Sequence, residues 1–141
     1  MFKNIKLLVL MLVSNTLLVS CFNMPTPPSQ ITGSYTSSLK YEKHDCSRLG
    51  IEINSLARRE NQLIVAQEQR VSSSQNQAFW LGFGNGDGIE ASELANVRGE
   101  KEAVRKAMEI KKCEELHKFN KEEAKKKLKN SKQKASDPEE S

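Results

Sequence analysis

Two stretches of the chain carry apolar residues at the spacing of an amphipathic helix. In the first, apolar positions three, four or seven residues apart fall at Leu49, Ile53, Leu56 and Leu63. No glycine or proline occurs between Gly50 and Gln75. Asp45 precedes the pattern and can cap a helix start, because its carboxylate accepts hydrogen bonds from unpaired backbone amides. The pattern predicts one helix from about Asp45 to Val71.

The second stretch begins near Glu90 and repeats apolar residues at similar spacing, at Leu94, Val97, Val104 and Met108. It predicts a helix that runs at least to Cys113. Acidic residues in its first turn and lysines near its end suit the helix dipole. Between the two helices, residues 78–88 combine aromatic side chains with four glycines at alternate positions, which break a helix. This segment is predicted to be the tip of a hairpin.

The first 20 residues have the composition of an export signal. Lys3 and Lys6 are followed by an apolar run that is shorter than the roughly 20 residues of a membrane-spanning helix. The sequence Leu18-Val19-Ser20-Cys21 resembles the lipobox at which bacterial lipoproteins are cleaved and acylated. We therefore expect residues 1–20 to be a lipoprotein signal peptide and Cys21 to carry the lipid.

Lipidation would place the protein in the bacterial cell envelope, attached to a membrane through its N-terminal lipid. No aspartate follows Cys21, which by the sorting rule of enteric lipoproteins favours the outer membrane. Ordinary secretion and a permanent N-terminal membrane helix are the alternatives. Without Lys3 and Lys6 the chain keeps 20 basic residues against 18 acidic ones, so its overall charge indicates no class of partner.

The remaining two cysteines predict how the helices are joined. If Cys21 carries lipid, Cys46 and Cys113 are an even pair in an oxidising compartment, where such pairs form disulfides. Residues 46–73 and 88–113 form arms of nearly equal length, so an antiparallel hairpin brings both cysteines to its open end. The predicted fold class is all-α, an antiparallel helical hairpin closed by a disulfide. Its apolar seam is interrupted by polar residues at Glu60, Gln67, Arg70 and Lys101.

Segments of different composition flank this hairpin, which spans residues 45–113. Residues 21–44 hold three of the four prolines and many hydroxyl side chains, and they are predicted to be a flexible, lipid-anchored tether. Residues 114–141 are a lysine-rich basic tail, predicted to be partly helical or disordered, with disorder past Asn130. A weak apolar stripe in this tail falls at Leu116, Phe119, Ala124 and Leu128.

Short motifs in the chain follow a known pattern. They are a Tyr-x-Ser opening at Tyr35, a cysteine soon after it, a Gly-Glu pair that ends at Glu100, and a closing Lys-x-Cys that ends at Cys113. Together they resemble a family of small, uncharacterised proteobacterial lipoproteins over about residues 18–113. The family has a longer aromatic segment at the middle of the hairpin and lacks the lysine tail. The resemblance implies the lipid anchor and the cysteine pair, and it implies no activity.

A zinc site is one candidate at the open end of the hairpin. His44 lies two positions before Cys46, and His117 lies four positions after Cys113. Two cysteines and two histidines can bind zinc tetrahedrally. Against such a site, exposed thiols oxidise outside the cytoplasm, and the His-x-Cys spacing is unusual for zinc. A small metal-binding lipoprotein is therefore the alternative function.

The tip residues 78–88 admit several interpretations. A phosphate-binding loop requires a Gly-Lys-Ser/Thr ending, which does not follow Gly88. A calcium loop needs acidic residues at the positions of Phe83 and Leu94. There remain an ordinary glycine-rich turn, an apolar group folded back onto the hairpin, and an exposed interaction surface. That surface would be formed by Phe79, Trp80, Leu81 and Phe83.

Catalysis and nucleic-acid binding find little support in the sequence. His44 and His117 are the only neutral-pH bases, and neither has a defined nucleophile and orienting acid nearby. No aromatic residue after Phe119 offers stacking to a nucleic acid. We expect no enzyme activity, no cofactor and no nucleic-acid partner. The sequence predicts an envelope interaction or scaffolding module that binds a protein partner or a second copy of itself.

Overall fold

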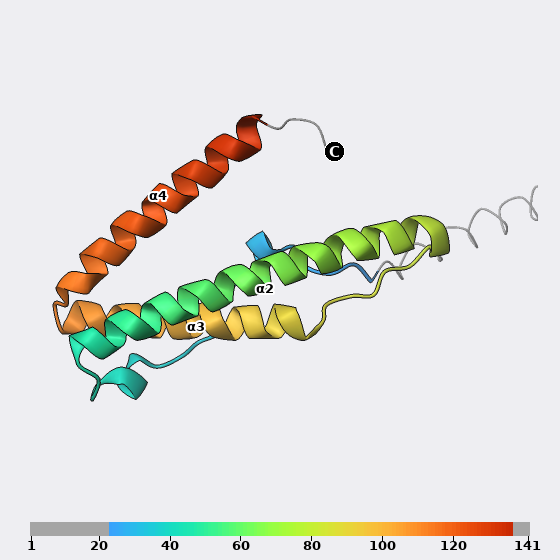
Figure 1. Ribbon diagram of the computed structural model, residues 1–141. Coiled ribbons are helices and arrows are strands. Elements are labelled where there is room, and N and C mark those ends of the chain that lie inside the picture. Colours follow the sequence, from blue (N-terminus) through green and yellow to red (C-terminus); the bar gives the residue numbers. More distant parts are fainter. Residues whose placement is uncertain (1–22, 137–141) are drawn as a thin grey trace, which may run out of the picture. The chain divides into compact units, whose positions relative to one another are not determined.

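The computed structural model describes residues 23–136, so the predicted signal peptide and Cys21 lie outside the described residues. Every regular element in this range is helical. Figure 1 shows the elements coloured in their order along the chain. The elements are the 3-10 helices η2 (Pro28–Gln30) and η3 (Ser38–Tyr41) and the α-helices α2 (Cys46–Leu81), α3 (Ile89–Ile110) and α4 (Glu114–Ser136). Helices α2 and α3 pack as an antiparallel hairpin, which confirms the predicted fold class. A search of the described part of the chain finds no helix with the length and apolar content to cross a bilayer.

The described residues form two compact units, and helix α2 passes through both. The tip unit comprises residues 23–31 and 63–92. The disulfide unit comprises residues 32–62 and 93–136. Each unit has its own set of buried side chains and hydrogen bonds.

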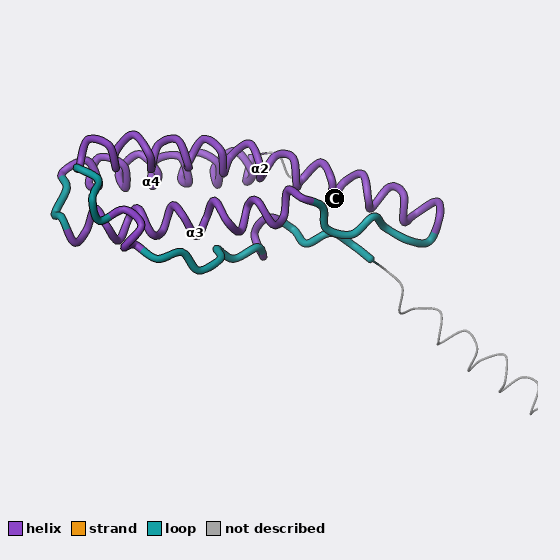
Figure 2. The backbone as a smooth tube through the Cα atoms, turned by 90° about the horizontal axis from the view of Figure 1, so that it is seen from below, coloured by secondary structure: helices purple, strands orange, loops and turns teal. Residues whose placement is uncertain are grey.

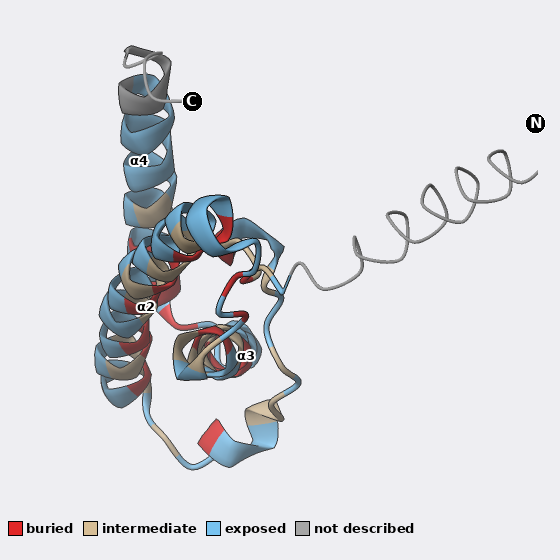
Figure 3. Cartoon of the chain, turned by 90° about the vertical axis from the view of Figure 1, so that its right-hand side faces the viewer, coloured by how far each residue is buried: buried red, intermediate tan, exposed pale blue. Residues whose placement is uncertain are grey.

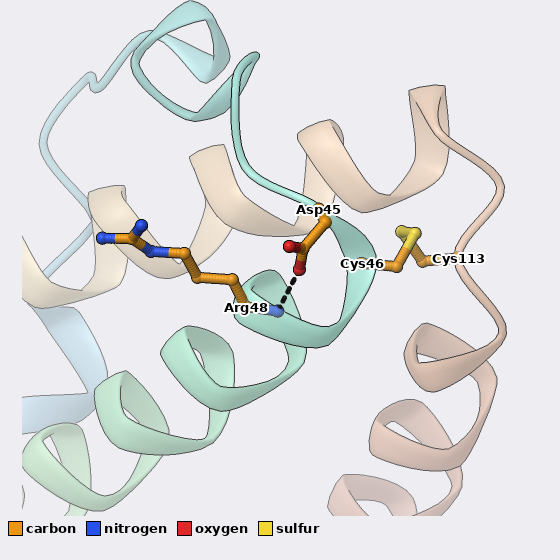
Figure 4. Close-up of a disulfide and its surroundings, with 4 residues drawn as sticks. All are labelled: Asp45, Cys46, Arg48 and Cys113. Carbon is orange, nitrogen blue, oxygen red and sulfur yellow. Dashed lines mark hydrogen bonds between the residues drawn. A yellow bond between two sulfur atoms is a disulfide. The ribbon is translucent and has the colours of Figure 1, made fainter.

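The disulfide unit contains the predicted staple. Cys46 and Cys113 are bonded through their sulfur atoms, with their Cα atoms 5.5 Å apart (Figure 4). The adjacent start of α2 is capped by Asp45, whose carboxylate accepts a hydrogen bond of 2.7 Å from the amide of Arg48. Both the disulfide and the cap are confirmed predictions.

The core of the disulfide unit lies between η3 and the three α-helices, and the buried residues of α2 and α3 lie on facing sides (Figure 3). It is formed by Tyr41, Leu49, Ile53, Leu56, Ala103, Val104, Ala107, Met108, Cys113, Leu116 and Phe119. Helix α4 contributes the last two of these side chains. The basic tail is therefore helical through Ser136, which corrects the expected disorder past Asn130. Its apolar stripe stops early, because Ala124 and Leu128 are exposed.

Charged side chains join the three α-helices beside this core. Glu60 in α2 accepts hydrogen bonds from Arg98, at 2.9 Å, and from Lys101. Lys101 also donates to Glu123 in α4 at 2.9 Å, and Arg105 donates to the same carboxylate at 3.0 Å. Burial alone raises the pKa of Glu60, but the hydrogen bonds and charges of Lys101 and Arg98 lower it overall. Glu60 and Lys101, two of the polar residues that interrupt the predicted apolar seam, therefore link the helices.

Residues 32–44, predicted to belong to a flexible tether, instead run along α3 (Figure 2). The hydroxyl of Ser34 donates to the side-chain oxygen of Asn96 at 3.0 Å. Lys40 forms an ion pair with Glu100, with 2.5 Å between nitrogen and oxygen. The polar side chains that suggested a solvated tether therefore bond to the helix.

Candidate interaction site at the aromatic tip

Helix α2 continues ten residues beyond Val71, the end predicted from the sequence, and carries three aromatic or aliphatic tip residues on its last turn. Serine, asparagine and glutamine dominate this extension, and serine and asparagine form helices less readily than leucine or alanine. Its inner face is nevertheless buried, at Ser74 and Ala78. The helix ends where Gly82 adopts a left-handed φ of 80°, and the Gly82 amide donates to the carbonyl of Ala78 at 2.8 Å.

The glycine-rich loop that follows is fixed by hydrogen bonds from two of its backbone amides. The hydroxyl of Ser74, fully buried within α2, accepts from the amide of Asn85 at 2.7 Å. The amide of Gly86 donates to the carbonyl of Asn23 at 2.9 Å. Gly86 has a φ of 66°, and a Cβ atom there would lie 2.5 Å from the side-chain nitrogen of Asn23. The left-handed φ favours glycine at this position, and a larger residue would also displace the Asn23 side chain.

Residues 23–31, which we call the strap, bond to this loop. They were predicted to be the first part of a flexible tether. The carboxylate of Asp87 accepts from the amide and the hydroxyl of Thr26, both at 2.6 Å. The side-chain amide of Gln67 donates to Asp87 at 3.0 Å and to the carbonyl of Thr26 at 2.9 Å. Three segments distant in sequence therefore meet at one carboxylate.

These contacts favour the charged form of Asp87. The hydroxyl of Thr26 makes the largest contribution, and with the Thr26 amide, Gln67 and the nearby charge of Arg70 it holds the pKa of Asp87 below its usual range. Arg70 in turn forms an ion pair with Glu90 at 3.0 Å. The polar residues that border the tip are thus bonded within the tip unit.

The aromatic residues of the tip point away from this framework. Phe79 and Trp80 are 80% and 81% exposed, and Leu81 and Phe83 are 60% and 51% exposed. The rings of Phe79 and Trp80 meet edge to face with their centroids 5.4 Å apart. The interpretation in which these side chains fold back onto the hairpin is therefore wrong, because the buried positions are taken by smaller residues, Ser74 and Ala78.

Most of the tip also lacks charged side chains. Residues 71–86 contain no Asp, Glu, Lys or Arg, although such residues make up 28% of the whole sequence. This stretch includes the last turns of α2 and most of the loop. The four apolar side chains of the tip are recognisable from the sequence. The residues that hold them in place are not, because Thr26 and Asn23 lie in a segment with the composition of a flexible tether.

The proposed zinc ligands do not gather into one site. Within the described range, one group of three potential ligand residues has its ligand atoms within 4.8 Å of one another, and it consists of Cys46, Cys113 and Glu115. Both sulfur atoms belong to the disulfide and are not available as thiolates. His44 instead packs its ring edge against Tyr41, with 5.7 Å between ring centroids. The predicted zinc site of two cysteines and two histidines is therefore wrong, because the two cysteines form a disulfide.

Comparisons with protein families, with curated proteins and with solved structures find no match to this chain. The resemblance to small proteobacterial lipoproteins stays a prediction from short motifs.

Proposed function

We propose that this protein is a lipid-anchored interaction module of the bacterial cell envelope, in which a stapled helical hairpin presents its aromatic tip to another envelope component. The observation that carries the proposal is the exposure of Phe79, Trp80 and Leu81 on an ordered helix end. Large apolar side chains clustered in water are unfavourable, and such clusters commonly mark contact surfaces.

The construction of the tip supports a binding role. A surface that is already ordered loses little conformational entropy when it binds. The loop is held by the Ser74 hydroxyl and the Asn23 carbonyl, and the strap is held by Asp87. These bonds hold the backbone in one arrangement before any contact is made.

The lipid anchor rests on the sequence alone. The export signal over residues 1–20 and the lipobox ending at Cys21 are the features that favour it. A multiply acylated cysteine anchors a protein stably, because each buried methylene group contributes about 0.8 kcal/mol.

The anchor is tested by growing cells with labelled palmitate. The wild-type chain should incorporate the label and sediment with membranes, whereas Cys21→Ser should incorporate none. An unlabelled wild-type chain would contradict the anchor.

The contact role of the tip is tested with a photoreactive amino acid in intact cells. Placed at Phe79 it should form covalent adducts, which mass spectrometry identifies as lipid or protein. The matched control places it at Val65, which is 53% exposed on α2 of the same unit and about 21 Å along the helix from Phe79. Equal adduct yields at the two positions would remove the tip as a contact surface.

A further inference from the structure

We infer that the component bound by the tip is lipid: the aromatic side chains enter the interface of the same membrane leaflet that holds the acyl chains on Cys21. This inference rests on the proposed lipid anchor. It names the partner of the tip as a phospholipid surface, so that the protein touches its membrane at two neighbouring points.

The position of the strap provides the first argument. Asn23, the first described residue, lies on the tip loop, where its carbonyl accepts from Gly86 at 2.9 Å. A Cβ atom added at Gly84 would lie 2.7 Å from the same carbonyl oxygen. Two residues of extended chain span at most about 7 Å. A lipid on Cys21 is therefore attached within about 7 Å of Asn23, which contacts the loop that carries Phe83.

The chemistry of the tip provides the second argument. The uncharged stretch over residues 71–86 avoids the cost of bringing ions to a hydrocarbon boundary. Phe79, Leu81 and Phe83 offer apolar surface, and Trp80 combines such surface with an N–H group, a combination enriched at membrane interfaces. Protein interfaces are enriched in arginine as well as in aromatic residues, and residues 71–86 contain no arginine.

The backbone of the loop provides the third argument. Amide groups that enter a membrane interface without a partner are costly. The amides of Gly82, Asn85 and Gly86 donate to Ala78, Ser74 and Asn23, respectively. The loop can therefore approach acyl chains with these donors satisfied. Insertion is shallow, on the order of 5 to 10 Å, as for other interfacial segments.

The test uses Trp80, the single tryptophan of the chain, as its own probe. The full chain is purified from cell membranes in detergent and reconstituted into protein-free vesicles of phosphatidylethanolamine and phosphatidylglycerol that contain brominated lipids. Bromines placed near the headgroups should quench Trp80 severalfold more than acrylamide in the water does, and its emission should shift to the blue.

The control is the double variant Trp80→Phe, Val65→Trp. It moves the probe about 22 Å along α2 within the same unit. Here acrylamide should quench and the brominated lipids should not. Both changes are at exposed positions, and unchanged circular dichroism checks that the variant folds.

The outcomes separate the two proposals, because mass spectrometry of the same sample shows whether Cys21 is acylated. An acylated chain whose Trp80 is open to acrylamide and untouched by brominated lipid overturns tip insertion alone. A chain without acyl groups overturns the anchor and, with it, the two-point attachment.

Discussion

Replacing both cysteines of the disulfide by alanine should lower the free energy of unfolding by about 4 kcal/mol. The bond between Cys46 and Cys113 joins positions 67 residues apart. Closing a loop of that length removes conformational entropy from the unfolded chain worth about 4 kcal/mol in the chain-entropy model. Domains of this size are stable by only about 5 to 15 kcal/mol in total. The staple should therefore supply a large share of the stability.

Urea unfolding followed by circular dichroism measures this change. The wild-type protein in a reducing agent is the matched control, since it should unfold near the midpoint of the variant, while the variant itself should not respond to reduction. A variant whose free energy of unfolding lies within about 1 kcal/mol of the oxidised wild type would refute the reasoning.

Three other changes probe separate contacts. Glu60→Gln should cost about 2 kcal/mol, because a neutral amide replaces the carboxylate that accepts charge-assisted hydrogen bonds from Arg98 and Lys101, and urea unfolding should show the loss. Lys112→Gly should raise the thermal midpoint, with a gain of about 1 kcal/mol, since Lys112 has a left-handed φ of 56° that favours glycine; an unchanged or lower midpoint would contradict this. Thr26→Val should destabilise the tip unit by about 1 kcal/mol at neutral pH. The pKa of Asp87 is lower in the folded protein than in the unfolded chain. The hydrogen bonds of its carboxylate therefore contribute their full stability above the ordinary aspartate pKa of about 3.9. This contribution is lost as the pH falls through the lowered pKa of the folded state. The difference between wild type and Thr26→Val in urea midpoint should therefore shrink in acid, and a difference that is constant with pH would contradict the role of Asp87.

The hairpin could be predicted because its signals are local. Apolar residues at helical spacing and a pair of cysteines at the ends of equal arms determine which helices form and which ends meet. Leu49 and Ile53, placed in the core from their spacing, are fully buried. The start of α4 was visible as well, in the weak stripe that includes Leu116 and Phe119.

The strap could not be predicted, because the contacts that hold it on the tip loop are distant in sequence. Thr26 in the strap bonds to a residue 61 positions away, and Ser34 in the segment that follows the strap bonds to one 62 positions away. A polar, proline-rich segment has the same composition whether it is solvated or bonded to a helix. The same ambiguity hid the end of α2, where Ser74 is buried because it holds the loop.

The most direct test of the tip and its strap is hydrogen exchange at the amide of Gly86, measured by nuclear magnetic resonance. This amide donates to the carbonyl of Asn23, and no regular helix protects it. With the strap in place, it should exchange much more slowly than the same amide in an unstructured peptide. Exchange at the peptide rate in the folded protein would mean that residues 23–31 leave the loop, and the arrangement that brings the lipid anchor to the aromatic tip would be contradicted.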